Sequence, residues 1–161
     1  KLAADSLEQA PTWDELAWLQ TRTRLPIVLK GILHADDARQ AARMGLAGVI
    51  VSNHGGRTLD TAVTAAQVLP GICQAVAADM AVLADGGIRR GTDMLKALAL
   101  GARAVLVGRP VLYGLANAGA QGVAHVLRIL RDELEITMAL CGCASASQVA
   151  SCTLYPTPST S

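Results

Sequence analysis

The residues best suited to chemistry stand together in one stretch, residues 49–60. The stretch begins with apolar β-branched residues, as a buried strand does, and then breaks into polar and glycine residues. His54 can exchange a proton near neutral pH, and Arg57 can bind a carboxylate through two hydrogen bonds. Gly55 and Gly56 let the backbone turn and approach a ligand. A base beside a carboxylate-binding cation predicts chemistry on a small organic acid.

Alternating strands and helices must position this stretch. The predicted strands are residues 25–31, 49–52, 81–84 and 104–107, and the predicted helices are 12–21, 35–44, 64–78, 92–100, 111–118 and 123–141. This alternation indicates a parallel sheet with right-handed crossovers. Each strand ends in a polar or glycine-rich group, which favours a (β/α)₈ barrel, whose ligands bind at the carboxyl ends of the strands. The glycines of residues 85–91 do not have the spacing of a Rossmann dinucleotide site. The four predicted strand–helix units are half of the eight units in such a barrel.

Several helix ends can be predicted from residue type. Thr12 and Glu15 have the spacing of a capping box at the start of the first helix. Thr92 is the predicted N-cap of the helix that closes at residue 100. Pro70 and Gly71 could break the helix in which they lie.

The last two strands predict a phosphate site. In barrels of this kind, the loops after the seventh and eighth strands bind phosphate together with a short extra helix. Gly86, Gly87 and Gly108 would offer backbone N–H groups to the phosphate, and Arg89 and Arg109 would add positive charge. The short helix after residue 110 would place its N-terminus nearby.

Composition narrows the class of protein. The 161 residues suffice for one core, and a net charge of +1 predicts no nucleic-acid partner. No run is long and apolar enough for a transmembrane segment, and the start lacks both the apolar core of a signal peptide and an initiator Met. Cys141 and Cys143 are the one close pair of cysteines. No further potential ligands cluster with them in the sequence, so no metal site is expected. Thiols in a reducing compartment predict a cytoplasmic location.

Five motifs together resemble the FMN-dependent α-hydroxy acid oxidases and dehydrogenases. They are Leu-Lys-Gly-Ile at 29–32, Ser-Asn-His-Gly-Gly-Arg at 52–57, Leu-Asp at 59–60, Asp-Gly-Gly-Ile-Arg at 85–89 and Gly-Arg-Pro at 108–110. The resemblance runs in register from about residue 12 to residue 149. It implies that residues 1–150 are the C-terminal half of a (β/α)₈ TIM barrel and leaves 151–161, rich in Ser, Thr and Pro, as a disordered tail.

The resemblance also implies a reaction. His54 would be the base that accepts a proton from the substrate, and Arg57 would bind the substrate carboxylate. The reaction would oxidise an L-2-hydroxy acid to a 2-oxo acid with FMN as cofactor. Oxygen or another electron acceptor would reoxidise the flavin, and the full-length protein would be a homo-oligomer.

A flavin-binding set follows from the same resemblance. It comprises Lys30, Ser52, Asp85, Gly86, Gly87, Ile88, Arg89, Gly108 and Arg109. Lys30 would stabilise negative charge on the reduced flavin, Ser52 would contact the ring and Asp85 the ribityl chain, while the others would surround the phosphate. From its position alone, Lys30 has an ordinary alternative, which is an ion pair with a carboxylate on the barrel rim.

Other functions stay open at this point. The family places further substrate-binding tyrosines, and an aspartate that orients the histidine, in an N-terminal half that this chain lacks. The fragment alone can therefore be inactive. One alternative is a half-barrel without catalysis that binds a phosphate group or a partner chain, and another is an FMN barrel with different chemistry, such as an isoprenoid diphosphate isomerase.

Overall fold

Four parallel strands form one sheet whose spatial order, β1-β2-β3-β4, is also their order in the chain. The computed structural model describes residues 10–152 and 154–155. The strands are β1 (Val28–Ile32), β2 (Gly48–Val51), β3 (Ala81–Asp85) and β4 (Ala104–Leu106). The longer helices are α2 (Trp13–Arg22), α3 (Ala35–Arg43), α4 (Ala65–Val76), α5 (Gly91–Ala99) and α6 (Arg109–Leu140), and the 3₁₀ helices are η1 (His54–Gly56) and η2 (Ala146–Ser151). The predicted alternation of strands and helices is confirmed.

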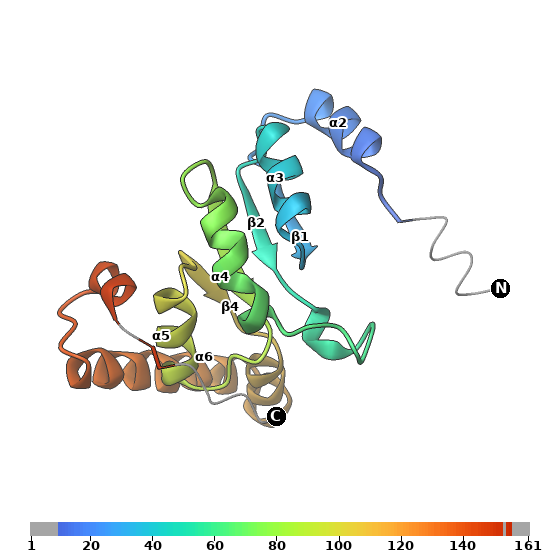
Figure 1. The fold of residues 1–161 in the computed structure, drawn as a ribbon. Helices are drawn as coiled ribbons and strands as arrows, with labels where there is room; N and C mark the ends of the chain where they lie inside the picture. Colours follow the sequence, from blue (N-terminus) through green and yellow to red (C-terminus); the bar gives the residue numbers. More distant parts are fainter. Residues whose placement is uncertain (1–9, 153, 156–161) are drawn as a thin grey trace.

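Helices α3, α4 and α5 cover one face of the sheet (Figure 1). On β2 and β3, the side chains that point to this face are almost fully buried: Val49 is 0% exposed, Val51 0%, Val82 1% and Ala84 4%. They pack with Leu69, Ile72 and Val76 of α4 into the main hydrophobic core. The helix-covered face therefore supplies most of the packing energy of the described chain.

The opposite face of the sheet is far less covered. Lys30, Ile50, Leu83 and Ala104 are register partners across the four strands, so they form one row on this face. Lys30 and Ala104 are exposed, and Ile50 and Leu83 are half-buried. In a closed barrel such a row forms one layer of the interior.

Several helix ends follow the predictions and one does not. Thr12 and Glu15 form the predicted capping box, in which the Glu15 N–H donates to Thr12 Oγ1 over 3.3 Å. The prediction that Thr92 caps α5 is wrong, because the helix begins at Gly91 with Arg90 as its N-cap. The Asp93 carboxylate accepts the Arg90 N–H over 3.0 Å, and this bond starts the helix earlier.

Helix α4 runs unbroken through Pro70, so the possible break there did not occur. The ring of Pro70 is on the exposed side of α4, while neighbouring Leu69 and Ile72 are buried. The missing proline N–H therefore costs one hydrogen bond but disturbs no packing.

Helix α6 consists of two helical parts, which match the two predicted helices. They meet at a kink where Ala118 has φ −148° and Gly119 has φ +56°. The second part packs against α5 so closely that a Cβ atom on Gly91 would overlap the backbone nitrogen of Leu134. The chain then turns into η2, which ends at Ser151, inside the predicted tail. Residues 1–9, 153 and 156–161 lie outside the described residues, and so does most of that tail.

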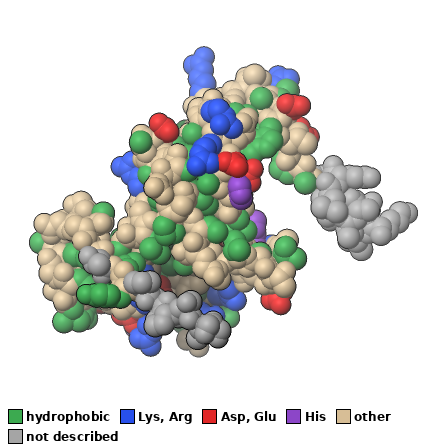
Figure 2. All heavy atoms as spheres, viewed as in Figure 1, with side chains coloured by type: hydrophobic (Ala, Val, Ile, Leu, Met, Phe, Trp, Pro, Cys, Tyr) green, Lys and Arg blue, Asp and Glu red, His purple; other side chains and the backbone are tan. Residues whose placement is uncertain are grey.

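Charge is spread over the surface. On the face shown in Figure 2, Lys and Arg side chains (blue) and Asp and Glu side chains (red) both occur in small groups, and neither forms one continuous patch. The described helices include none that is long and apolar enough to cross a membrane. Among the described residues, no group of three or more His, Cys, Asp or Glu side chains is placed to bind a metal ion.

Candidate active site

A β-bulge at the end of β1 shapes one wall of the site. The register with β2 shifts between Lys30 and Ile32, and Gly31 between them has φ +100°. A Cβ atom on Gly31 would lie 3.0 Å from Cε1 of His54, a contact so tight that the imidazole would have to shift. Glycine at this position therefore meets two needs: it tolerates the left-handed backbone and leaves space for the imidazole.

Ser52, immediately after β2, joins three parts of the site by hydrogen bonds. It is the one buried polar residue among those described, with 0% exposure. Its Oγ accepts from the Lys30 Nζ over 2.9 Å and from the His54 backbone N–H over 3.1 Å, and it donates to the Asp85 Oδ2 over 2.6 Å. A single buried hydroxyl thus fixes the ends of β1, β2 and β3 relative to one another.

Lys30 and Asp85 form an ion pair across this hydroxyl, with 2.6 Å between Nζ and Oδ2. Burial of Asp85 works against its charged form, but hydrogen bonds from Lys30 and Ser52 and the charges of Lys30 and His54 outweigh it. The pKa of Asp85 therefore lies below its ordinary value. The rim ion pair considered for Lys30 exists, and the same ammonium also lines the pocket.

His54 and Arg57 lie at the two ends of the short helix η1. His54 has φ +56°, a left-handed conformation that is costly for a residue with a side chain. Arg57 is the C-cap of η1, and both side chains are exposed and line the same pocket. The turn after β2 thus presents the predicted base and the predicted carboxylate-binding cation to one space.

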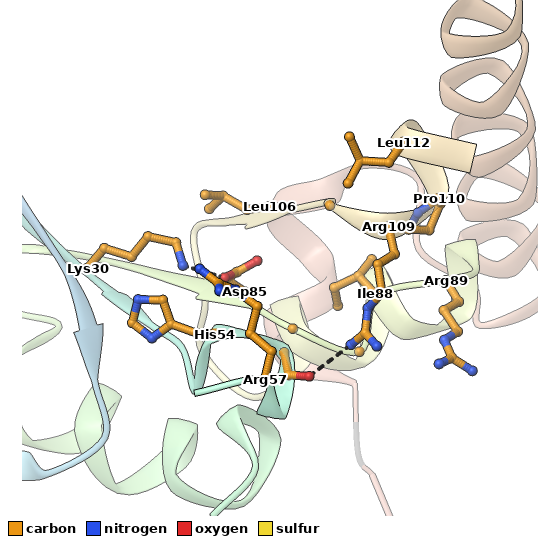
Figure 3. Close-up of a pocket in the computed structure, with 14 residues that line it drawn as sticks. Lys30, His54, Arg57, Asp85, Ile88, Arg89, Leu106, Arg109, Pro110 and Leu112 are labelled. Carbon is orange, nitrogen blue, oxygen red and sulfur yellow. Dashed lines mark hydrogen bonds and ion pairs between the residues drawn. The ribbon is translucent and has the colours of Figure 1, made fainter. Parts of the chain in front are cut away.

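The loops after β3 and β4 form the far end of the site. Gly86 and Gly87 both have positive φ, +103° and +78°. Arg109 donates from Nη2 to the Gly55 carbonyl oxygen over 3.1 Å, so it ties the start of α6 to the turn after β2. A Cβ atom on Gly55 would come within 3.0 Å of that guanidinium. In Figure 3, Lys30, His54 and Asp85 lie at one end of the pocket, and Arg89 and Arg109 lie at the other.

These groups surround a pocket of about 370 Å³. Every predicted site residue lines it except Ser52, which lies beneath it as a support. Sequence reasoning missed the apolar wall formed by Leu106, Pro110 and Leu112. The period of two along β4 could have indicated Leu106, whereas Leu112 depends on the tilt of α6 and left no signal in the sequence.

Comparisons with known proteins establish the family. Residues 1–156 match the family model described as FMN-dependent dehydrogenase. The chain belongs to the FMN-dependent dehydrogenase family. An L-lactate oxidase of Nostoc sp. is 54% identical over 146 residues, which are 91% of this chain and 40% of the relative. A peroxisomal (S)-2-hydroxy-acid oxidase of Oryza sativa is 53% identical over 149 residues, which are 92% of this chain and 41% of the relative.

The structural comparison confirms the predicted fold class, a part of a (β/α)₈ barrel. A crystal structure of mandelate oxidase matches 89% of this chain with a TM-score of 0.86 and 49% identity, and the match covers 43% of that enzyme. The chain thus spans about two fifths of the relatives it matches. FMN, the predicted cofactor, is named in the family description, and a related mandelate oxidase structure is described with an FMN adduct.

The residues of the pocket fit FMN. The cofactor carries a phosphate dianion at one end and a ring that becomes negative on reduction at the other. The pocket has Arg89 and Arg109 at one end and Lys30 at the other. Between them, Gly86 and Gly87 present backbone without side chains. The distribution of positive charge along the pocket is therefore complementary to the cofactor.

Proposed function

We propose that the protein to which this chain belongs oxidises an L-2-hydroxy acid to a 2-oxo acid. One observation carries the proposal: η1 presents His54 and Arg57, three residues apart, to one pocket whose far end holds Arg89 and Arg109. A proton acceptor, a carboxylate-binding cation and an anion-binding end are the parts that this reaction needs in one place.

His54 accepts the proton, and Arg57 orients the substrate. The guanidinium of Arg57 holds the substrate carboxylate by paired, charge-assisted hydrogen bonds, and this fixes the α-carbon relative to the imidazole. Whether the α-hydrogen leaves as a proton or as a hydride, the imidazole of His54 takes up one proton from the substrate. The strained backbone of His54 and its bond to Ser52 Oγ limit the directions in which the ring can point.

The remaining residues hold the cofactor. FMN, when bound, accepts the two electrons removed from the substrate. Lys30 supplies positive charge at the ring end, while Ser52 and Asp85 hold the Lys30 ammonium in position. The phosphate end is held by Arg89, Arg109 and the backbone of the glycine loops, including Ile88 and Gly108 beside the start of α6.

The proposed partners include the substrate, the electron acceptor and further copies of the protein. The substrate is a small 2-hydroxy acid, the electron acceptor is oxygen or another oxidant, and the full-length protein forms a homo-oligomer. The cytoplasmic location stays a prediction, since one relative is named as peroxisomal. Within the described residues, β1 and β4 are the edge strands and one sheet face is far less covered than the other, which supports assembly with the remainder of a barrel.

The test is the visible absorption spectrum of the intact protein with FMN, recorded without oxygen before and after addition of L-2-hydroxy acids. We expect binding to perturb the flavin spectrum and the substrate to bleach it. His54→Gln should keep the perturbed spectrum and slow bleaching by at least about a thousandfold, because glutamine forms hydrogen bonds but accepts no proton. Arg57→Met should mainly raise the substrate concentration at which the flavin is bleached at half its maximal rate.

Two results would contradict the proposal. A flavin that binds but is bleached by none of the acids would favour other FMN chemistry. Phosphate binding that excludes FMN, unchanged in His54→Gln, would favour the half-barrel without catalysis.

A further inference from the structure

Two cysteines near the C-terminus lie in contact, far from the pocket in the chain. The sulfur atoms of Cys143 and Cys152 are 3.1 Å apart. Cys143 is buried, with 8% exposure, and Cys152 is half-buried. We call these two residues the C-terminal thiol pair. Nothing in the proposed reaction uses them.

Backbone hydrogen bonds hold both members of the pair in place. After α6, Gly142 turns the chain with φ +72°, and the Cys143 N–H donates to the Met138 carbonyl over 2.8 Å. At the end of η2, the Cys152 N–H donates to the Val149 carbonyl over 2.9 Å. The contact between the two sulfur atoms is therefore set by two ordered helix ends.

The pair also belongs to a small separate core. Cys143 and Val149, which is 0% exposed, pack with Leu95 of α5, and Cys152 packs against the same cluster. Helix α5 follows the loop that carries Arg89. The thiol pair thus lies where the end of α6, η2 and α5 meet.

We propose that Cys143 and Cys152 form an oxidisable dithiol, and that hydrogen peroxide converts it into a disulfide that locks η2 onto the end of α6. The sulfur atoms need to approach by only about 1 Å to reach bonding distance. Closure would join residues nine positions apart, so the loop that it constrains contains all of η2.

The reaction balances in two steps. The hydrogen bond with Cys143 raises the pKa of the Cys152 thiol, so the reaction starts from its minor thiolate form. That thiolate attacks one peroxide oxygen, the O–O bond breaks, and the leaving hydroxide takes up a proton to become water. The Cys143 sulfur then displaces the hydroxyl group from the Cys152 sulfenic acid, which leaves as a second water. The two thiols lose two electrons and two protons, and one peroxide becomes two waters. The inference uses no property of the pocket, so it stands independently of the proposed function.

The other two cysteines serve as internal controls. Cys141 is exposed and lies two residues before Cys143. Cys73 is buried in the main core, and burial raises the pKa of its thiol to about 11. Exposure alone would make Cys141 the preferred target of peroxide, whereas the geometry makes the pair the preferred site of disulfide formation.

The experiment is a disulfide map of the intact protein after limited treatment with hydrogen peroxide and alkylation in denaturant. No Lys or Arg follows Arg131, so trypsin leaves all three C-terminal cysteines in one peptide, and thermolysin, which cleaves before Val149, must separate them. We expect a linked pair of peptides that has lost two hydrogen atoms and is released by dithiothreitol. Amide exchange in η2 should slow at least about tenfold on oxidation and recover on reduction.

Variants decide which sulfur atoms take part. Cys141→Ser should give the same linked peptides, while Cys143→Ser and Cys152→Ser should each abolish them. A link that is lost in Cys141→Ser would overturn the proposal, as would free thiols at Cys143 and Cys152 after Cys141 has been oxidised. Circular dichroism confirms that each variant keeps its fold.

Discussion

Two helices begin beside the pocket, but their N-termini are arranged differently. At α5, the Asp93 carboxylate accepts the N–H groups of Arg89 and Arg90, and Glu133 accepts that of Gly91 over 2.8 Å. At α6, Gly108 is the N-cap, and no side chain in the described part of the chain caps the helix. The first N-terminus is closed by the protein's own carboxylates, whereas the second opens onto the pocket.

This difference shows that a helix N-terminus near a pocket is not by itself an anion-binding site. The positive end of the α5 dipole is already neutralised by two carboxylates, and α6 packs directly over it. Only α6 can direct its N-terminal dipole at a ligand. We therefore expect α5 to determine stability and α6 to determine anion binding. The first three of the four measurements below test this division, and the fourth tests the ion pair at the end of β3.

The largest effect should come from adding one methyl group at each helix start. Gly91→Ala should destabilise the protein by at least about 3 kcal/mol, because its Cβ would overlap the backbone of α6. Gly108→Ala, which has open space around it, should cost less than about 1 kcal/mol. Urea unfolding of the intact protein measures the free energy of unfolding of both variants. Equal losses in the two would contradict the expected difference between the helix starts.

The next effect concerns the α6 side of the pocket. Arg109→Ala should weaken FMN binding about thirtyfold or more, because it removes one charge from the phosphate end and the bond to the Gly55 carbonyl. Arg103→Ala is the matched control, since Arg103 precedes β4 at the opposite end of the strand. Quenching of flavin fluorescence gives both affinities. Equal weakening in the two variants would mean that only net charge matters.

A smaller effect is expected on the α5 side. Glu133→Gln keeps an acceptor for the Gly91 N–H but removes the negative charge at the helix N-terminus and the pairing with Arg90. We expect a loss of about 1 kcal/mol in the free energy of unfolding. FMN affinity should stay within about threefold of its original value. A fall in affinity as large as that of Arg109→Ala would show that α5 also acts on the anion.

The smallest effect is a pH dependence at Asp85, the last residue of β3 before the loop to α5. Because the folded protein lowers the pKa of Asp85, its stabilising contribution is present above the unfolded value of about 3.9 and is lost as pH falls through the folded pKa. Asp85→Asn should therefore differ from the original protein by a constant amount above about pH 5, and this difference should shrink below about pH 4. Urea unfolding at several pH values measures it. A difference that persists to pH 3 would contradict this assignment.

Much of the fold could be predicted from sequence because it depends on local patterns. Apolar runs indicated all four strands, and the Thr12 capping box was confirmed. The N-cap of α5 was missed because Asp93 offers a carboxylate that competes with Thr92 for the helix start. Pro70 was tolerated because tertiary packing places its ring toward solvent, which residue type does not reveal.

The site could be predicted as a set of residues but not as a network. Pattern and resemblance placed His54, Arg57 and Lys30 among the candidates, and the structure brings them to one pocket. Their chemical roles stay predictions. The hydrogen bonds of Ser52 with Lys30 and Asp85 join positions 22 and 33 residues apart, and the contact of Arg109 with the Gly55 carbonyl joins positions 54 residues apart. Such contacts arise from register and packing, which a single sequence does not encode locally.

The close approach of Gly31 to His54 has an evolutionary consequence. The two positions are expected to be coupled, because a Cβ atom at position 31 would press on the imidazole at 3.0 Å and require it to shift. A lineage that loses His54 is released from the steric part of this constraint, and only the left-handed backbone still favours glycine. A side chain at position 31 would therefore meet two obstacles, the positive φ and the imidazole, and only the second depends on the residue at position 54.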